Sequence, residues 1–445
     1  MARRMGATGG ASGTLGGAIG RAAALAGVLA VLALSTAPAL AQQETGSSWT
    51  ILEYDEQGRV IGSQSGSGVP EVEEEPDAFQ KEVEPGELLI ADPPPDAEGT
   101  LSGLGFQVLE RSSLGALEIE MWRVQAPASM SLPDAIERVR EALPDAIVDS
   151  NDLLDLSAGR AASAPARPQL AQARRDFARD TVGWGAVPES CGAGVRLGQI
   201  DGAVDLGHPA LADRDVVYKS LIKPGRREAE EDHGTAIAVL LVGKPRPGRF
   251  GGLLPGATLY AANIFEEWGG RTRGNLAAMI RAVDWLVANG VQVANFSVAG
   301  GDNKLMRLAV ARASAKGLLI VAAAGNKGAG APPAWPAADP KSLAVTAIDR
   351  GLDLYPHANR GSYIDFAAPG VGLLTETPRG LREQSGTSMA TPFVTAVVAL
   401  HLQAGFPADP DRIRESMKGY AHDLGDAGRD RNYGWGLVRL RPQCK

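Results

Sequence analysis

The sequence predicts an α/β protein in which a parallel sheet, covered by helices on both faces, follows a small α+β domain. From Val195 onward, apolar strand segments alternate with helical segments, a pattern typical of parallel sheets buried on both faces. Before them, residues 87–156 show the order strand, helix, strand, strand, helix, strand. The chain has 445 residues, 44% of them hydrophobic, which is enough for two domains that each bury a core.

The chain begins with the features of an export signal. Arginines precede an apolar segment at 22–34, and a small-x-small cleavage pattern follows at 39–41. We therefore expect a signal peptide at residues 1–41, with an uncleaved membrane anchor as the alternative. The exported protein would be periplasmic or extracellular, without membrane contact after the signal is removed.

A polar segment is expected at 42–86, with an acidic run at 73–77 and a Gly/Ser cluster at 62–68. Low hydrophobicity and clustered like charge predict that this segment is mostly disordered. The whole chain has a formal charge of −8 and no long basic run, so nucleic acid is not expected as a partner.

The small α+β domain is expected at 87–156. Its strands are predicted at 87–91, 106–110, 117–125 and 146–148, and its helices near 96–104 and from Ser131 onward. The order β-α-β-β-α-β is the ferredoxin-like plan. Residues 157–179 are rich in Ala, Arg, Pro and Gln, which predicts an exposed linker that proteases can reach.

The larger α/β domain is expected at 180–445. Its strands are predicted at 195–200, 259–264, 291–297, 318–323, 343–348 and 364–366, and its helices at 234–242, 275–288, 304–316 and 393–402. In such sheets, ligands bind beyond the carboxyl ends of the strands. Asp201, Asn326 and residues 295–297 lie at or near such ends.

Ser388 is the predicted nucleophile. It lies in the run Gly-Thr-Ser-Met-Ala-Thr-Pro at 386–392, just before an apolar helix. We interpret this run as a loop that leads into the first helical turn, where free N–H groups and the helix dipole stabilise a developing anion. The alternative is an ordinary turn in which Ser388 only caps the helix.

The predicted partners of Ser388 are a histidine and an aspartate, because a serine needs a base and the base needs a carboxylate that fixes its tautomer. Of five histidines, only His233 lies in a helix-opening Asp-His-Gly-Thr-Ala run. Only Asp201 ends a buried strand immediately upstream. We therefore predict a catalytic set of Asp201, His233 and Ser388, in that chain order.

Further motifs surround these residues. They are Ile200–Asp205 with His208–Leu211, His233–Thr235 with Ala238, Ala323–Asn326, Trp335–Pro340, Asn359–Ser362 with Ala367–Gly370, and Tyr433–Gly436. Together they resemble the subtilisin-like serine proteases (subtilases, the peptidase S8 family) over roughly residues 180–440. The chain order Asp, His, Ser is also that of subtilisin.

The resemblance implies a monomeric serine endopeptidase that hydrolyses proteins or peptides through an acyl-enzyme intermediate. It implies that Asn326 donates to the oxyanion, and that Ser297, Val298, Ala299 and Gly300 pair with substrate as with an added strand. It implies no required cofactor. Calcium commonly stabilises members of this family, but no motif here identifies a metal site.

The resemblance also implies a role for residues 87–156, which lie between a signal and a protease domain. By position they resemble the propeptide that inhibits subtilases and assists their folding. We expect removal in cis, because a strand at 147–156 followed by a flexible linker would reach the chain's own cleft. The alternative is an unrelated small α+β domain.

Two positions depart from the family pattern. Gly202 and Ala203 replace the usual Thr or Ser and Gly, so a hydroxyl that helps to hold the carboxylate is missing. This departure motivates the alternative of a catalytically weak or inactive peptide-binding relative. Asp232 replaces a Gly before the histidine, and glutamates precede it at 228, 230 and 231. These acidic residues either line the cleft or, as we expect, form a solvated loop.

The two cysteines, Cys191 and Cys444, are expected to pair in an oxidising compartment. A bridge would close a loop of 444 − 191 = 253 residues. In the chain-entropy treatment a loop of that size stabilises the fold by roughly 5 kcal/mol. The family does not require this bridge. Two free thiols are the alternative, because sequence does not show whether the Cα atoms come within about 7 Å.

Overall fold

The computed structural model describes residues 48–54, 60–67, 81–157, 177–246, 251–268 and 270–444. The chain divides into two compact units, Met1–Ala78 and Phe79–Lys445, and each is described by itself. The expected signal peptide, acidic run and most of the expected linker lie outside the described residues.

The first unit contains one antiparallel strand pair, β1 (Ser48–Tyr54) with β2 (Val60–Ser67). This pair lies inside the segment for which the sequence predicted no regular structure. The difference has a local cause, because the aromatic and β-branched residues between Trp49 and Tyr54 favour strands despite their polar surroundings.

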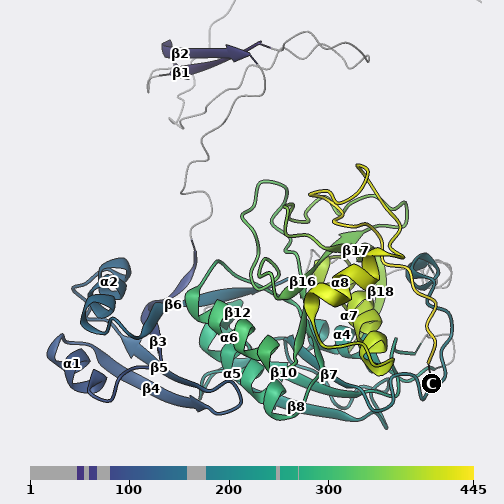
Figure 1. Ribbon diagram of the computed structural model, residues 1–445, viewed down its shortest axis with the longest axis horizontal. Coiled ribbons are helices and arrows are strands. Elements are labelled where there is room, and N and C mark those ends of the chain that lie inside the picture. The colour runs from purple at the N-terminus through teal and green to yellow at the C-terminus, as the bar shows by residue number, and fades with distance from the viewer. Residues whose placement is uncertain are drawn as a thin grey trace, which may run out of the picture. The chain divides into compact units, whose positions relative to one another are not determined.

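The N-terminal α+β domain of the second unit has the predicted order of elements (Figure 1). These are β3 (Val83–Ala91), α1 (Ala97–Gly103), β4 (Gln107–Leu114), β5 (Ile119–Gln125), α2 (Leu132–Ala142) and β6 (Ile147–Leu156). The strands pair antiparallel in the spatial order β4-β5-β3-β6, as in the ferredoxin-like plan. Two strands extend beyond the prediction, since β3 begins at Val83 and β4 continues to Leu114. β6 is longer than the strand predicted at 146–148 and has the bounds of the strand-like end expected at 147–156.

Both faces of this small sheet are buried. Leu88 and Ile90 pack with α1 and α2 in one core, whereas Leu89 and Ala91 pack against helices of the larger domain in another. This explains why β3 is a continuous apolar run rather than an alternating one. The N-terminal domain therefore depends on the larger domain to cover one of its faces.

The larger domain, called the sheet domain below, contains a seven-stranded parallel sheet. Its order is β17-β16-β15-β13-β7-β10-β8. The bounds are β7 (Arg196–Asp201), β8 (Val216–Ser220), β10 (Thr258–Asn263), β13 (Val293–Phe296), β15 (Leu319–Ala323), β16 (Ser342–Ile348) and β17 (Phe366–Pro369).

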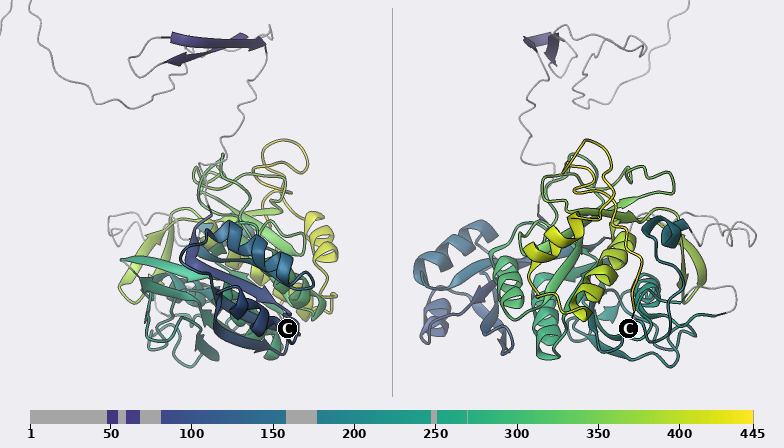
Figure 2. Two further views of the ribbon diagram at one scale, coloured as in Figure 1. Left: turned by 90° about the vertical axis from the view of Figure 1, so that its left-hand side faces the viewer. Right: turned by 45° about the vertical axis from the view of Figure 1, so that its right-hand side comes forward.

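Helices cover both faces of the parallel sheet, as the sequence predicted (Figure 2). On one face lie α4 (Asp232–Val242), α7 (Thr387–Gln403) and α8 (Pro410–Lys418). On the other lie α5 (Leu276–Ala288) and α6 (Lys304–Ala315). None of the helices in the described parts of the chain is long and apolar enough to span a bilayer.

The two domains share a second sheet through β6. Its last residues pair with β12 (Arg271–Asn275) on one side and with β14 (Val298–Ala299) on the other. Beyond β12 the sheet continues through β11 (Phe265–Trp268) to β9 (Arg227–Glu228). The sequence did not predict β9, β11 and β12, whereas β14 lies in the segment expected to pair with an added strand. β11 and β12 form a hairpin, and only its pairing with β9 and β6 joins it to distant segments.

The chain end is covalently fixed to the sheet domain. Cys191 and Cys444 form a disulfide with a Cα–Cα distance of 4.8 Å, as predicted. Before this end, the hairpin of β18 (Leu373–Thr377) and β19 (Gly380–Gln384) leads into α7.

Candidate active site

Ser388 lies in the first turn of α7, as expected. This helix packs on β13, β15, β16 and β17, so its N-terminus is held at the edge of the parallel sheet. Ser388 is fully buried. Free N–H groups in a first helical turn favour negative charge, so the serine occupies a position suited to anion stabilisation.

Asp201, His233 and Ser388 form a hydrogen-bonded chain. His233 Nδ1 lies 2.7 Å from Asp201 Oδ1, and His233 Nε2 lies 2.9 Å from Ser388 Oγ. Asp201 is the last residue of β7, and His233 lies at the start of α4. A histidine with one nitrogen on a carboxylate and the other on a hydroxyl can accept the hydroxyl proton.

Gly234 allows this close approach of α4 to β7. A Cβ at this position would lie only 2.4 Å from the carbonyl oxygens of Gly202 and Ala203. Gln199 also donates from Nε2 to the Gly234 carbonyl oxygen at 2.9 Å. The residue after the histidine therefore fixes the distance between the two elements that carry His233 and Asp201.

Asn326 is oriented towards a peptide carbonyl group. Its Oδ1 accepts hydrogen bonds from Thr387 N at 3.0 Å and from Thr387 Oγ1 at 3.1 Å. Because both bonds use the amide oxygen, the Nδ2 group points away from α7. It donates to the carbonyl oxygen of Ser157 at 2.6 Å. Thr387 is thus a positioning residue, which the sequence motif contained but which was not predicted.

The end of β6 lies in the cleft as an added strand. Ser157 N donates to Ser297 O at 2.8 Å, and β14 pairs Val298 with Leu156 and Ala299 with Asp155. Gly300 adjoins Leu154, since a Cβ on this glycine would lie 2.5 Å from Leu154 Cδ2. All four predicted substrate-contacting residues, Ser297 to Gly300, therefore contact the chain's own strand.

The departure at Gly202 has a visible consequence. Asp201 accepts a hydrogen bond from Gly202 N at 2.6 Å through Oδ1. Its other oxygen, Oδ2, is buried without a hydrogen-bond partner among the described residues. A Cβ at Gly202 would meet only Glu230 O, at 3.6 Å. The position therefore has room for a side chain that could supply the missing hydroxyl.

Two of the four acidic residues before His233 line the cleft, and Glu230 and Glu231 are exposed, as expected for a solvated loop. Glu230 and Asp232 border an open cleft of about 580 Å³ that also contains His233 and Asn326. Arg379, from the hairpin of β18 and β19, donates to Asp232 Oδ2 at 2.5 Å and to Glu230 Oε2 at 2.9 Å. The sequence alone gave no sign of this arginine, because 147 residues separate it from Asp232.

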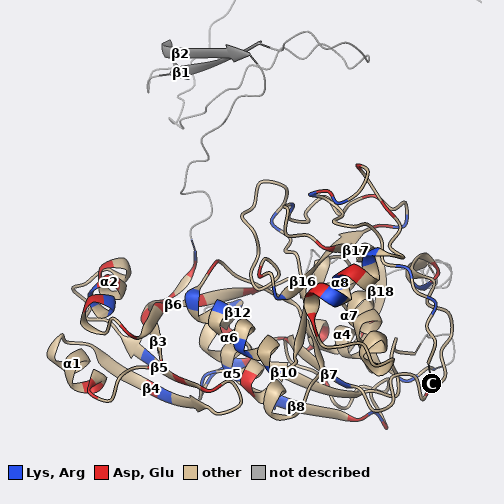
Figure 3. Cartoon of the chain, in the orientation of Figure 1, with Lys and Arg blue, Asp and Glu red and all other residues tan. Residues whose placement is uncertain are grey.

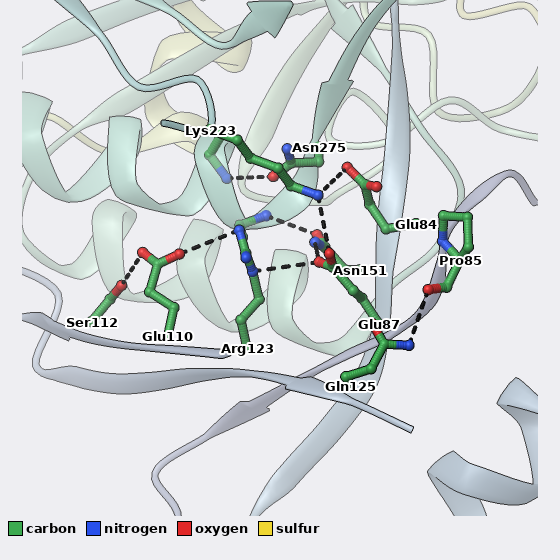
Figure 4. A network of polar contacts seen from close by, with 12 residues as sticks. Glu84, Pro85, Glu87, Glu110, Ser112, Arg123, Gln125, Asn151, Lys223 and Asn275 are labelled. Carbon is green, nitrogen blue, oxygen red and sulfur yellow. Dashed lines mark hydrogen bonds and ion pairs between the residues drawn. The ribbon is translucent and has the colours of Figure 1, made fainter. Parts of the chain in front are cut away.

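A network of polar contacts joins the two domains away from the cleft. Lys223 Nζ lies 2.7 Å from Glu84 Oε1 and 3.1 Å from Glu87 Oε1 (Figure 4). Arg281 Nη1 lies 3.0 Å from Glu110 Oε1. We call these five residues the charged seam. Acidic and basic positions both occur where the two domains meet (Figure 3).

Polar groups of β6 also bind the N-termini of two helices of the sheet domain. Asn151 Oδ1 accepts from Ala277 N, in the first turn of α5, at 3.2 Å. Asp149 Oδ2 accepts from Lys304 N, at the start of α6, at 2.9 Å. Such bonds satisfy N–H groups that have no partner within the helix. They explain why the middle of β6 is polar although it is buried.

No group of three or more His, Cys, Asp and Glu side chains that could hold a metal ion occurs among the described residues. The expectation that no cofactor is required remains a prediction, because calcium sites also use backbone carbonyl oxygens and water.

Comparison with known proteins identifies the family. A sequence model of the Subtilase family, Peptidase_S8, matches residues 192–436, which is more than half of the chain. The chain belongs to the subtilase family.

Individual subtilases match over the same region. The minor extracellular protease Epr of Bacillus subtilis is 34% identical over 230 residues, which is 51% of this chain and 35% of that protein. Subtilisin E of Bacillus subtilis is 28% identical over 258 residues, or 56% of this chain and 65% of that protein. The aligned part is therefore less than two thirds of the length of each of these subtilases.

A solved structure extends the similarity of fold. Fervidolysin from Fervidobacterium pennivorans, described as a keratinolytic enzyme related to subtilisin, superposes with a TM-score of 0.66 at 21% sequence identity. The superposition covers 81% of this subtilase and 61% of fervidolysin. At this identity the match supports the fold alone.

Proposed function

We propose that this subtilase is an exported serine endopeptidase that hydrolyses protein or peptide substrates. One observation carries the proposal. A continuous hydrogen-bonded chain joins Asp201, His233 and Ser388, and next to it Asn326 donates to the peptide carbonyl oxygen of Ser157. Asn326 is itself held by Thr387, the residue before Ser388, so the nucleophile with its base and the donor that holds a peptide carbonyl oxygen are neighbours, as acyl transfer requires.

In the proposed reaction, Ser388 Oγ attacks the carbonyl carbon and its proton moves to His233 Nε2. Asp201 accepts the Nδ1–H bond and stabilises the imidazolium. Asn326 Nδ2 and the backbone N–H of Ser388 stabilise the oxyanion. His233 then gives the proton to the leaving amine, and water hydrolyses the acyl-enzyme by the same steps in reverse.

Labelling with a fluorophosphonate tests this proposal. The self-processed enzyme should react rapidly at neutral pH and become covalently modified on Ser388, whereas Ser388→Ala should not react. A substitution of Ser416, a helix serine outside the cleft, serves as the matched control and should leave labelling intact. Absence of labelling in the processed wild-type protein would contradict the proposal.

We infer that the N-terminal domain is a propeptide, removed by cleavage of the bond that follows Ser157. Three contacts support this site. Residues 155 and 156 pair with β14, Ser157 N donates to Ser297 O, and the Ser157 carbonyl oxygen accepts from Asn326. The strand thus occupies the cleft as a substrate would, and its Ser157 carbonyl oxygen is held by the proposed oxyanion donor.

Expression in a host that lacks other proteases tests the maturation step. The wild-type chain should yield a product that begins at Ala158, identified by N-terminal sequencing. Ser388→Ala should retain residues 42–157 in the same polypeptide. Normal processing of Ser388→Ala under these conditions would contradict cleavage in cis.

Export is supported by the signal-like pattern at 22–41 and by the name of the Bacillus relative Epr, which is described as extracellular. Cell fractionation should find the processed chain, without residues 1–41, outside the cytoplasm.

We further propose that activity needs no metal ion, and treatment with EDTA before assay should leave the rate unchanged. Loss of activity that calcium restores would overturn this second point.

A catalytically weak, peptide-binding relative is the second candidate, favoured by the buried Asp201 Oδ2 atom that lacks a partner among the described residues. Casein turnover distinguishes the two. Binding without turnover, together with absent fluorophosphonate labelling, would support the weak relative.

A further inference from the structure

We propose that the cleft contains an anion-binding subsite, formed by Arg273 and Lys327, that selects substrates with a carboxylate side chain at the third residue before the scissile bond. The inference rests on the proposed function, because it concerns the substrates of the same cleft. With Ser157 as the first residue before the bond, the third is Asp155.

Two cations hold the Asp155 carboxylate, one on each oxygen. Arg273 Nη1 donates to Asp155 Oδ1 at 2.7 Å, and Lys327 Nζ lies 2.8 Å from Asp155 Oδ2. The cations come from different segments, since Arg273 belongs to β12 and Lys327 directly follows Asn326. A carboxylate that bridges two separate elements is held more specifically than one with a single surface partner.

The backbones that carry these cations are fixed. Arg273 lies within β12 and pairs with Glu266 of β11 in the antiparallel ladder. Lys327 N donates to Asn359 Oδ1 at 2.8 Å. The subsite therefore does not depend on Asp155 for its backbone geometry, and it should persist when another peptide replaces β6.

The register of a bound peptide is fixed on both sides of the subsite. Leu154 is fully buried against Gly300, and the Ser157 carbonyl oxygen is held by Asn326. In a substrate anchored at these two points, the third residue before the scissile bond lies between Arg273 and Lys327. Charge at this residue is thus recognised at a defined position rather than by general attraction.

Removal of the N-terminal domain leaves both cations without their carboxylate partners among the described residues. Arg273 also pairs with Glu82 at 2.8 Å. Glu82 and Asp155 both precede the proposed cleavage site after Ser157, so both leave with the N-terminal domain. The other carboxylates that line the cleft, Glu230 and Asp232, pair with Arg379. The processed cleft therefore presents two unneutralised cations to an incoming peptide.

The experiment compares three fluorogenic peptides on the self-processed enzyme, obtained by expressing the full chain. They carry Leu-Asp-Leu-Ser, Leu-Asn-Leu-Ser or Leu-Leu-Asp-Ser before the cleaved amide. Partly exposed ion pairs are individually weak, so two together predict a kcat/KM for the first peptide about tenfold above the second. The preference should shrink in 1 M salt. The third peptide, with its carboxylate displaced, should gain no such advantage.

Variants assign the preference to the two cations. Lys327→Gln and Arg273→Gln should each lower the ratio of kcat/KM for the Asp and Asn peptides about threefold, and Lys327→Glu with Arg273→Glu should favour a Leu-Lys-Leu-Ser peptide. Lys244→Gln is the matched control, because Lys244 pairs with exposed Asp213 away from the cleft, and it should keep the wild-type ratio.

Two results would overturn the subsite while leaving the proposed function intact. One is equal kcat/KM for the Asp and Asn peptides, both being cleaved. The other is an equal advantage for both acidic peptides, which would indicate long-range attraction instead. Failure to cleave any peptide, together with absent fluorophosphonate labelling, would overturn the proposed function itself.

Discussion

The N-terminal domain contacts the sheet domain at two places that differ in specificity. One place can bind only this domain, whereas the other can bind many extended peptides. At the charged seam, the contacts join side chains specific to this chain, such as Lys223 with Glu84 and Glu87. In the cleft, residues 153–157 bind mainly through backbone pairing with β12 and β14. Any extended peptide can make backbone pairs of this kind, whereas only this domain can complete the seam.

The largest expected effect is on kcat, because it concerns the chemical step that follows binding in the cleft. Ser388→Ala should lower kcat by about 10⁶-fold, the magnitude established for subtilisin when it loses its nucleophilic serine. Both sets of contacts should survive, because Ser388 takes part in neither. Intact mass and hydrogen exchange of the variant would check this, and loss of protection in β6 would contradict it.

The seam should be sensitive to removal of its central cation. Lys223→Ala leaves Glu84 and Glu87, 5% and 8% exposed, without that partner. Breaking a buried ion pair on one side typically costs about 3 kcal/mol. In the Ser388→Ala background, hydrogen exchange of β3 and β6 amides should report easier opening of the N-terminal domain.

A matched control for this change exists on the same interface. Lys316 pairs with Glu118, whose side chain is 60% exposed. Lys316→Ala should change the exchange of β3 and β6 amides by no measurable amount, because exposed pairs contribute little. Equal effects of the two substitutions would contradict the distinction between the buried seam and the exposed pair.

Asp152, a buried carboxyl group within β6, predicts that the stability of the chain depends on pH. Burial raises the pKa of Asp152, and the nearby Lys81, with Nζ 2.9 Å from Oδ2, only partly opposes this. Because its pKa is raised on folding, the group's stabilising contribution is present below its unfolded pKa. That contribution is lost as the pH rises through the folded pKa.

Comparison of Ser388→Ala with and without Asp152→Asn isolates this effect. The free energy of unfolding of the two chains, from urea titrations between about pH 4 and pH 7, should diverge by at most about 1.4 kcal/mol per pH unit, since one proton is involved. The chain that keeps Asp152 should lose stability relative to Asp152→Asn as the pH rises. A constant difference across this range would show that Asp152 does not titrate there.

The smallest expected effect is a gain at the catalytic end of the cleft. Gly202→Ser would place a hydroxyl beside Asp201 Oδ2, and the position has room for a Cβ. We expect kcat/KM to rise a few-fold, because the net contribution of a typical hydrogen bond is about 1 kcal/mol. Gly202→Ala is the control without a hydroxyl and should give no gain. A gain from both substitutions would indicate a backbone effect.

The sequence predicted the parts of the site that reside in local motifs. Ser388 and His233 begin helices, Asp201 ends a strand, and Asn326 follows one, and the structure brings all four together. The order of elements in the N-terminal domain was predicted for the same reason, because apolar periodicity and helix starts such as Ser131 are properties of single segments.

The rest depends on pairing between distant segments. Arg273 and Lys327 are ordinary surface cations in sequence, and only the register of β6 places Asp155 between them. Likewise, the sequence predicted a strand-like end at 147–156 but assigned no role to Asp149 and Asp152 within it. Their partners, Lys304 N and Lys81, belong to other segments and leave no trace in the local pattern of β6.

The disulfide between Cys191 and Cys444 encloses nearly the whole sheet domain in a covalent ring. A protease that acts on itself will cut exposed loops, and many of these loops lie inside that ring. A molecule nicked once between the two cysteines would keep its mass on a non-reducing gel and separate into fragments only after reduction. Under the proposed function, self-digestion would therefore accumulate unnoticed, because the disulfide would keep the fragments joined.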